Sequence, residues 1–139
     1  DLFAGIGSIT LEFASRDCKD ITSVELNPKH AGFINSTANE LDMGLQVNVQ
    51  RADVFDWLKR KRNHEKKYEI IFADAPFETE ENKYNEMIDL VLNNELLKPN
   101  GIFILEHQSR IKFTHPNLKD TRKYGNVSFS FFQSEPISK

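Results

Sequence analysis

Short strand-like segments alternate with helical segments along the whole chain, and this alternation constrains the fold more than any other feature. Apolar runs and two-residue alternation predict strands over residues 21–26, 45–50, 67–74 and 102–107. Helical periodicity predicts a helix that contains residues 9–14 and further helices over about 28–41, 54–62 and 84–97. Strands that alternate with helices build an α/β fold around a mostly parallel, doubly wound sheet with right-handed crossovers.

Turn and cap residues mark the ends of these segments. Asn27-Pro28 supplies an N-cap and a first-turn proline, and Asp53 is placed to cap the third helix. The helix over 84–97 is expected to end at the sequence KPNG. Gly125-Asn126 lies between two extended segments and predicts an antiparallel hairpin at one edge of the sheet. Along that hairpin the alternating residues Val127, Phe129 and Phe131 are predicted to face the core.

Composition limits the classes of protein that are possible. A chain of 139 residues with 39% hydrophobic side chains suits one globular domain, and a net charge of -3 excludes binding of nucleic acid by bulk charge. The single cysteine, Cys18, excludes a disulfide framework and a multi-cysteine metal site, which indicates a cytoplasmic protein. Cys18 itself is expected to be a small packing residue. No apolar run approaches the roughly twenty residues of a membrane span. Neither a metal nor a membrane partner is expected.

The first residues, DLFAGIG, predict a tight turn that opens a helix. Gly5 and Gly7 directly precede the amphipathic helical pattern, and such a turn normally follows a buried strand. Only the last residues of that strand, Asp1 to Phe3, are present, so we expect the chain to be the C-terminal part of a longer protein. Thr10 stands where a dinucleotide site has its third glycine, which favours a nucleoside ligand without phosphates.

Ligands of a parallel sheet bind beyond the carboxyl ends of its strands, which draws attention to the residues at those ends: 1–7, Glu25, Asp53, 74–77 and 106–110. Glu25 follows Gly5 by twenty residues, a spacing at which an acid can accept the ribose hydroxyls of a nucleoside. A purely structural, helix-capping role is the alternative for Glu25. Asp53 can accept the amino group of an adenine or only cap its helix, and both interpretations stay open.

The segment IIFADAPFE ends a buried strand with an acid and a proline. The planar amino group of a base donates two hydrogen bonds, which the Asp74 carboxylate and the Ala75 carbonyl can accept. Pro76 holds residue 75 extended, and Phe77 can stack on the base. Held in this way, the nitrogen lone pair can be directed at an electrophilic methyl group. The alternative is a strand end with a turn-forming proline and a core phenylalanine.

Five segments together resemble a known family: DLFAGIGSITLEFASR, VELNP, ADVFDWL, IIFADAPFE and LLKPNGIFILEH. They are similar to the class I S-adenosylmethionine-dependent methyltransferases and, more narrowly, to the RsmD family, which methylates the 2-amino group of a guanine in small-subunit (16S) ribosomal RNA. The resemblance runs from residue 1 to about residue 132. It implies one Rossmann-like S-adenosylmethionine-dependent methyltransferase domain over residues 1–139, without the N-terminal arm that helps to hold the RNA and without most of the first strand. We therefore expect the chain as written not to be competent for catalysis.

The resemblance also implies which residues form the site. The residues that it assigns to the S-adenosylmethionine pocket are Asp1, Phe3, Ala4, Gly5, Gly7, Glu25, Leu26, Asp53 and Val54. It assigns the catalytic target-base motif to Asp74, Ala75, Pro76 and Phe77. The family usually has Asp-Pro-Pro-Tyr or Asp-Pro-Pro-Phe, so Ala75 departs from it. The Ala75 carbonyl survives this change but some rigidity is lost, and reduced rather than abolished activity is expected.

Two basic segments compete as contacts of the RNA. Residues 59–67, KRKRNHEKK, join a helix end to a strand start on the face opposite the site, and a solvated helix terminus is expected there. Arg110 and Lys112 follow the carboxyl end of the strand at 102–107 and are predicted to contact RNA phosphates, with a plain solvated loop as the alternative.

Two further residues near these strand ends are His107 and Asp74. For His107 a structural role is favoured over a role in the site. An acid at position 74 favours guanine slightly, because guanine offers a ring N–H and an amino group side by side.

Three other functions compete with this prediction. An adenine amino-methyltransferase that acts on DNA shares the tetrapeptide, and product identity separates the two. A non-catalytic cofactor-binding or RNA-binding domain of the same fold would bind the cofactor without turnover. A nicotinamide-dependent dehydrogenase is disfavoured by Thr10 and by residues 74–77. The expected partner is 16S ribosomal RNA or the small ribosomal subunit, and a monomer is expected.

Overall fold

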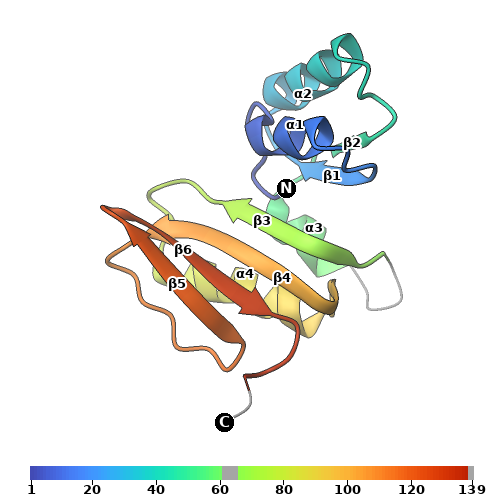
Figure 1. Ribbon diagram of the computed structural model, residues 1–139. Helices are drawn as coiled ribbons and strands as arrows, with labels where there is room; N and C mark the ends of the chain where they lie inside the picture. The colour runs from blue at the N-terminus through green and yellow to red at the C-terminus, as the bar shows by residue number, and fades with distance from the viewer. Residues whose placement is uncertain (61–65, 138–139) are drawn as a thin grey trace. The chain divides into compact units, whose positions relative to one another are not determined.

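The computed structural model describes residues 1–60 and 66–137, and its internal contacts divide the chain into two units, Asp1–Trp57 and Leu58–Lys139 (Figure 1). The first unit contains α1 (Ser8–Ser15), β1 (Ile21–Val24), α2 (Pro28–Glu40) and β2 (Val47–Gln50). The second contains β3 (Tyr68–Asp74), α4 (Glu81–Asn93), β4 (Leu97–Gln108), β5 (Leu118–Tyr124) and β6 (Val127–Gln133). The division falls within α3 (Val54–Arg60). The helix predicted over 54–62 is therefore confirmed as far as residue 60, and residues 61 and 62 lie outside the described residues.

The first unit is built on two parallel strands. β1 and β2 pair in parallel, with Ile21 opposite Val47. Residues before α1 run beside β1, because Leu2 forms a parallel bridge with Val24 and the Val24 N–H donates to the Asp1 carbonyl at 2.9 Å. The predicted strands at 21–26 and 45–50 are thus confirmed, each in a shorter form.

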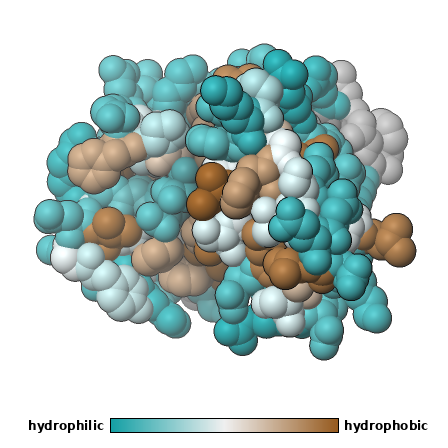
Figure 2. All heavy atoms as spheres, turned by 90° about the horizontal axis from the view of Figure 1, so that it is seen from above, coloured by the Kyte–Doolittle hydropathy of each residue, from teal (hydrophilic) through white to brown (hydrophobic). Residues whose placement is uncertain are grey.

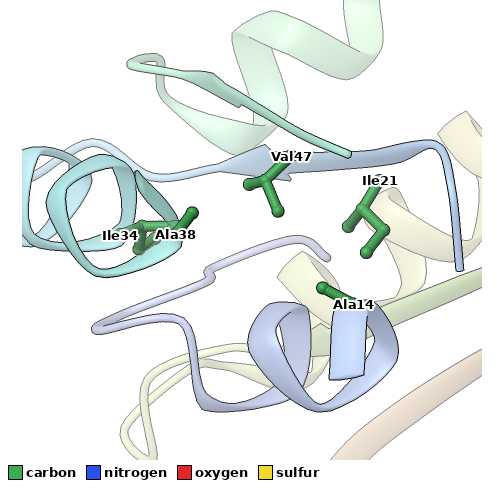
Figure 3. Close-up of a cluster of buried hydrophobic side chains, with 5 residues drawn as sticks. All are labelled: Ala14, Ile21, Ile34, Ala38 and Val47. Carbon is green, nitrogen blue, oxygen red and sulfur yellow. The ribbon is translucent and has the colours of Figure 1, made fainter. Parts of the chain in front are cut away.

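The core of the first unit lies between its helices and its strands. Figure 3 shows five buried side chains that converge from α1, β1, α2 and β2, and they are Ala14, Ile21, Ile34, Ala38 and Val47. Burial of a side chain such as Ile34 stabilises the fold by roughly 1.5–3 kcal/mol. Cys18 packs against this cluster while it stays partly exposed, which confirms its predicted packing role.

Both predicted helix caps are present. The Asn27 side chain accepts hydrogen bonds from the N–H groups of Lys29 and His30, and Pro28 occupies the first helical position of α2. The Asp53 Oδ2 atom accepts the N–H of Asp56 at 3.0 Å at the start of α3. These side chains use backbone donors that a helix start leaves without a partner, which is why the two helices begin where the sequence predicts.

The second unit is a mixed four-stranded sheet in the order β3-β4-β6-β5. β3 and β4 are parallel, whereas β6 pairs antiparallel with both β4 and β5. α4 connects β3 to β4 and buries one face through Tyr84, Met87, Ile88 and Val91. The hairpin predicted at Gly125-Asn126 is confirmed, and Gly125 has the positive φ of 63° that the turn requires.

Two sequence predictions in this unit are wrong. The helix predicted over 84–97 begins at Glu81 and ends at Asn93, because Glu95 takes a positive φ of 54° and Leu97 already pairs with Tyr68. The sequence KPNG therefore lies within β4. The register of β3 against β4 shifts between the pair Tyr68–Leu97 and the pair Ile70–Ile102. A positive φ does not continue a right-handed helix.

The hairpin also buries the opposite face from the one predicted. Ser128, Ser130 and Phe132 are buried, whereas Val127, Phe129 and Phe131 are only partly covered. The buried hydroxyls have partners, because Ser128 bonds Ser109 at 2.8 Å and Ser130 bonds His107 at 2.7 Å. A hydroxyl with a hydrogen-bond partner is buried at little cost, so the apolar alternation alone gave the wrong face.

The face seen in Figure 2 has hydrophobic side chains in small groups among hydrophilic ones. The exposed large apolar residues include Ile6, Leu26, Leu45 and Phe77. Among the helices of the described residues, none is long and apolar enough to cross a membrane.

Candidate functional site

The glycine turn before α1 is held by a carboxylate from the next strand end. Gly5 and Gly7 have positive φ values of 59° and 87°, and the Gly7 N–H donates to the Ala4 carbonyl at 2.9 Å. Glu25 Oε1 accepts the Gly5 N–H at 2.8 Å, and Oε2 accepts the Asn27 N–H at 2.9 Å. The Glu25 carboxylate therefore has the structural role that the sequence left open, and it joins the turn to the start of α2.

A network of buried hydrogen bonds also holds the residues around this turn. Asp1 Oδ2 accepts both the Thr10 N–H, at 3.1 Å, and the Thr10 hydroxyl, at 2.8 Å. The Thr10 and Ser23 hydroxyl oxygens lie 2.5 Å apart, and both residues are fully buried. Because Thr10 donates to Asp1, Ser23 donates to Thr10. Thr10 thus ties α1 to β1, a role that sequence reasoning missed because it compared Thr10 only with a glycine.

All residues predicted for the cofactor lie in the first unit and at one edge of its strands. The Glu25 N–H donates to the Gln50 carbonyl at 3.1 Å, and the Ala52 N–H donates to the Glu25 carbonyl at 3.2 Å. These bonds bring the end of β1 beside the segment that leads to Asp53 and Val54. Leu26 is 61% exposed and Val54 is buried. Phe3 contacts Phe55 edge to face, with 6.3 Å between ring centroids.

The second unit contains a pocket at the carboxyl end of β3. Its volume is about 360 Å³, and it is lined by Asp74, Ala75, Pro76, Phe77, Tyr84, Glu106, His107, Gln108 and Val127. All four residues of the predicted target-base motif are therefore brought together at one pocket. Ala75 is buried, whereas Phe77 is 65% exposed. Thr79 closes the turn, because its N–H and its hydroxyl both donate to the Pro76 carbonyl, at 2.9 and 2.6 Å.

Two carboxyl groups lie side by side in this pocket. Asp74 and Glu106 are register partners at the ends of the parallel strands β3 and β4. Burial raises the pKa of Asp74, and a side-chain hydrogen bond with Glu106 partly offsets that rise. Burial also raises the pKa of Glu106, and the charge of Asp74 and the hydrogen bond with it raise that pKa further. The sequence placed Glu106 at a strand end but could not show that it pairs with Asp74.

His107 is a buried histidine with both ring nitrogens bonded. Nδ1 lies 2.8 Å from the Gln108 carbonyl and Nε2 lies 2.7 Å from the Ser130 hydroxyl. A carbonyl only accepts, so Nδ1 carries the proton and Ser130 donates to Nε2. Burial lowers the pKa of His107, the bond to Gln108 opposes this, and the charge of Lys112 lowers the pKa again. The ring is thus held neutral, and its expected structural role is confirmed although it also lines the pocket.

Arg110 is connected to the target-base motif through one side chain. Its Nε donates to Gln108 Oε1 at 2.6 Å, and Gln108 Nε2 donates to the Phe77 carbonyl. Gln108 is buried, whereas Arg110 and Lys112 are exposed. Sequence reasoning placed Gln108 at a strand end but gave it no role, since no pattern links it to the loop that contains Phe77.

The denser basic segment lies only partly within the described residues, and no metal-ligand cluster is present in them. Of residues 59–67, positions 61–65 lie outside the described residues, and Lys59 forms an ion pair with Glu86 at 3.5 Å. Within residues 1–60 and 66–137, no three His, Cys, Asp or Glu side chains are grouped as metal ligands.

Comparisons with known proteins give relatives in sequence and in structure. The family model described as Conserved hypothetical protein 95 matches residues 1–133. The chain is 31% identical over 139 residues to ribosomal RNA small subunit methyltransferase D of Buchnera aphidicola subsp. Baizongia pistaciae, with 96% of the chain and 68% of that protein covered.

Among solved structures, a putative methylase from Haemophilus influenzae has a TM-score of 0.83 and 29% identity, with 96% of the chain and 84% of that chain covered. An RNA methyltransferase from Salinibacter ruber, in complex with S-adenosyl-L-homocysteine, has a TM-score of 0.73 and 14% identity, with 100% and 82% covered. At that identity the second likeness concerns the fold alone.

Proposed function

The chain belongs to the RsmD family, described as Conserved hypothetical protein 95, and we propose that it methylates the 2-amino group of a guanine in 16S ribosomal RNA. Its fold is that of the class I methyltransferases, and its activity is the S-adenosylmethionine-dependent methylation of ribosomal RNA. The guanine, its 2-amino group and the small-subunit RNA are the parts that we propose.

One observation carries the proposal: residues 74–77 line a single pocket at the carboxyl end of β3. The Asp74 carboxylate and the Ala75 carbonyl accept the two hydrogens of the target amino group, and the exposed Phe77 ring stacks on the base. These contacts fix the direction of the nitrogen lone pair, so the main gain is orientation. The base must leave its stack or lie in an unpaired loop to enter.

The cofactor supplies the methyl group on a sulfonium sulfur. As the N–C bond forms and the S–C bond breaks, the amino nitrogen becomes cationic and must lose a proton. Asp74 already accepts a hydrogen bond from this nitrogen in the proposed arrangement, so its carboxylate is placed to take that proton. The products are a neutral methylamino group and a neutral thioether.

The first unit fits the nucleoside part of S-adenosylmethionine. A Cβ at Gly5 would meet no atom within 4 Å, so open space lies beside the turn. Each oxygen of the Glu25 carboxylate accepts one backbone N–H, which leaves lone pairs for ribose hydroxyls. Asp53 keeps a second oxygen for the adenine amino group, besides the one that caps α3. The other residues proposed for this pocket are Asp1, Phe3, Ala4, Gly7, Leu26 and Val54.

Arg110 and Lys112 are the proposed phosphate contacts. Both follow β4, whose end lines the target-base pocket, and both side chains are exposed. Exposed cations near a base pocket can bind the phosphates of the RNA. Such contacts position the RNA but do not distinguish one base sequence from another.

The product identifies the function. The full-length protein is incubated with methyl-labelled S-adenosylmethionine and with small ribosomal subunits from cells that lack the enzyme, and the labelled nucleoside is then identified after digestion. We expect the label on the 2-amino group of guanosine. Label on adenosine would show that adenine is the target in place of guanine. Cofactor binding without methyl transfer would favour the non-catalytic alternative.

A further inference from the structure

Glu106 lies beside the target-base motif but has no role in the function proposed so far. It is the register partner of Asp74 across two parallel strands, and it lines the same pocket as Ala75 and Phe77. Its side chain points to the same face of the sheet as Asp74, because paired residues of neighbouring strands share a face. Any base that reaches Asp74 in this pocket therefore also meets Glu106.

The surroundings of this carboxyl pair are low in positive charge. Tyr84 of α4 and His107 of β4 line the pocket with it, and the charge of Arg110 acts on Tyr84 together with the charges of both acids. On the sheet, Arg122 of β5 is separated from Glu106 by Phe129 of β6. Among the described residues, Asp74 and Glu106 take part in no ion pair with a basic side chain.

Two neighbouring carboxyl groups without a cation between them do not ionise independently. Each carboxylate disfavours the charge of the other, so the empty pair retains one proton over part of the ordinary pH range. Burial raises the pKa of both groups, and the charge of Asp74 raises the pKa of Glu106 further, so a retained proton on the pair is consistent with both shifts. A ligand that brings two hydrogen-bond donors to the pair can displace that proton.

We infer that Glu106 is a specificity-determining residue that accepts the ring N1–H of guanine while Asp74 accepts a hydrogen of the 2-amino group. The inference rests on the proposed function, because it names how the same pocket selects its base. N1–H and the 2-amino group are adjacent on guanine, and two ionised carboxylates are acceptors only, so the donors and acceptors match. Adenine has a lone pair at N1 beside its amino group, and an ionised Glu106 would face that lone pair unfavourably.

The proton balance of this arrangement can be measured. The empty pair holds one shared proton, the bound guanine supplies two N–H donors in its place, and the shared proton leaves to solvent. Binding of guanine therefore requires both carboxyl groups to be ionised, so kcat/KM should fall on the acid side through the higher pKa of the pair. In Glu106→Gln only Asp74 has to ionise, and it no longer has a charged neighbour. The acid limb of that variant should therefore lie at lower pH.

The test compares the wild-type full-length protein with Glu106→Gln, which keeps the size of the side chain, and with Glu78→Gln, which changes an exposed acid outside the pocket lining. Guanine methylation in small ribosomal subunits is measured from pH 5 to pH 9. We expect Glu106→Gln to lose roughly five- to tenfold in kcat/KM above pH 8, since a neutral acceptor replaces a charged one. Its acid limb should move to lower pH, and Glu78→Gln should match the wild type.

A second measurement reads the pair without activity. Carboxyl carbon NMR of the wild type should show Asp74 and Glu106 titrating together, with one step above the usual range, and Asp74 should titrate at lower pH in Glu106→Gln. The inference is overturned if guanine is labelled by both proteins with the same kcat/KM and pH profile, or if the two groups titrate independently. If the wild type labels no guanine, the proposed function fails and the inference fails with it. If the wild type labels guanine but Glu106→Gln behaves like it, only the inference fails.

Discussion

The Glu25 carboxylate accepts the Gly5 N–H at 2.8 Å across twenty residues of sequence, and its other oxygen accepts the Asn27 N–H at 2.9 Å. One side chain therefore fixes both the glycine turn and the start of α2. The same acid is proposed to bind the ribose of the cofactor, so structural support and ligand binding meet at one group.

Glu25→Gln should weaken both of these roles. An amide has one oxygen in place of two, so one of the two backbone N–H groups loses its acceptor, at a cost of about 1–2 kcal/mol in the free energy of unfolding. Binding of S-adenosylhomocysteine should weaken about tenfold or more. Denaturant unfolding and calorimetric titration measure the two effects. Unchanged values for both would show that the turn and the cofactor do not depend on this carboxylate.

The two glycines of the turn should differ in their tolerance of a side chain. A Cβ at Gly7 would lie 2.7 Å from Ile34 Cγ1, and Ile34 is fully buried in the core. A Cβ at Gly5 would meet no atom within 4 Å, and only the positive φ opposes it. Gly7→Ala should therefore cost more stability than Gly5→Ala, which should cost about 1 kcal/mol. Equal losses in thermal unfolding would contradict the close packing of Gly7 on Ile34.

The buried histidine should make stability depend on pH. The pKa of His107 is lowered in the folded state, so the unfolded state takes up a proton first as the pH falls. The stability that the neutral ring contributes is present above the unfolded pKa of about 6.5 and is lost as the pH falls from there through the lower folded pKa.

His107→Gln should be less stable than the wild type at pH 7.5 and should lose less stability between pH 7.5 and pH 5. The amide can replace only part of the bonding to Gln108 and Ser130. Unfolding by denaturant at several pH values measures the slope. A slope equal to that of the wild type would mean that the ring takes up its proton in the folded state as readily as in the unfolded state.

Arg110→Ala and Lys112→Ala should each weaken binding of the RNA by a similar factor whatever its sequence. A lost phosphate contact lowers the slope of log K against log salt by about one. Lys98→Ala is a matched control, because Lys98 lies near the start of β4 and pairs with Glu69 at 3.0 Å. Binding of small-subunit RNA is measured from 50 to 200 mM salt. If all three variants bind alike, the loop after β4 does not contact the RNA.

The starts of α2 and α3 were accessible from the sequence because local side chains determine them. Asn27, Pro28 and Asp53 act on backbone groups within three residues, so their effect can be seen in the sequence itself. The motif of residues 74–77 was also accessible, since its four members are contiguous and line one pocket.

Features that depend on distant partners were missed. Ser128 and Ser130 are buried because Ser109 and His107 satisfy their hydroxyls, and a pattern of alternation does not contain those partners. The end of α4 was placed too late, because Leu97 pairs with Tyr68 of another strand. Glu106 was seen as a strand-end acid, but only the register of β3 and β4 makes it the neighbour of Asp74.

The most direct test of the central claim is methyl transfer by Asp74→Ala in the full-length protein. Glu78→Ala, which removes an exposed acid outside the pocket lining, is the matched control, and S-adenosylhomocysteine binding shows that the variant is folded. With labelled S-adenosylmethionine and unmethylated small ribosomal subunits, Asp74→Ala should lose at least a hundredfold in rate, since it removes the charged acceptor that orients the amino group. The control should transfer methyl groups to the 2-amino group of guanosine at the wild-type rate. Transfer by Asp74→Ala within a few-fold of the wild type would contradict the proposed role of residues 74–77.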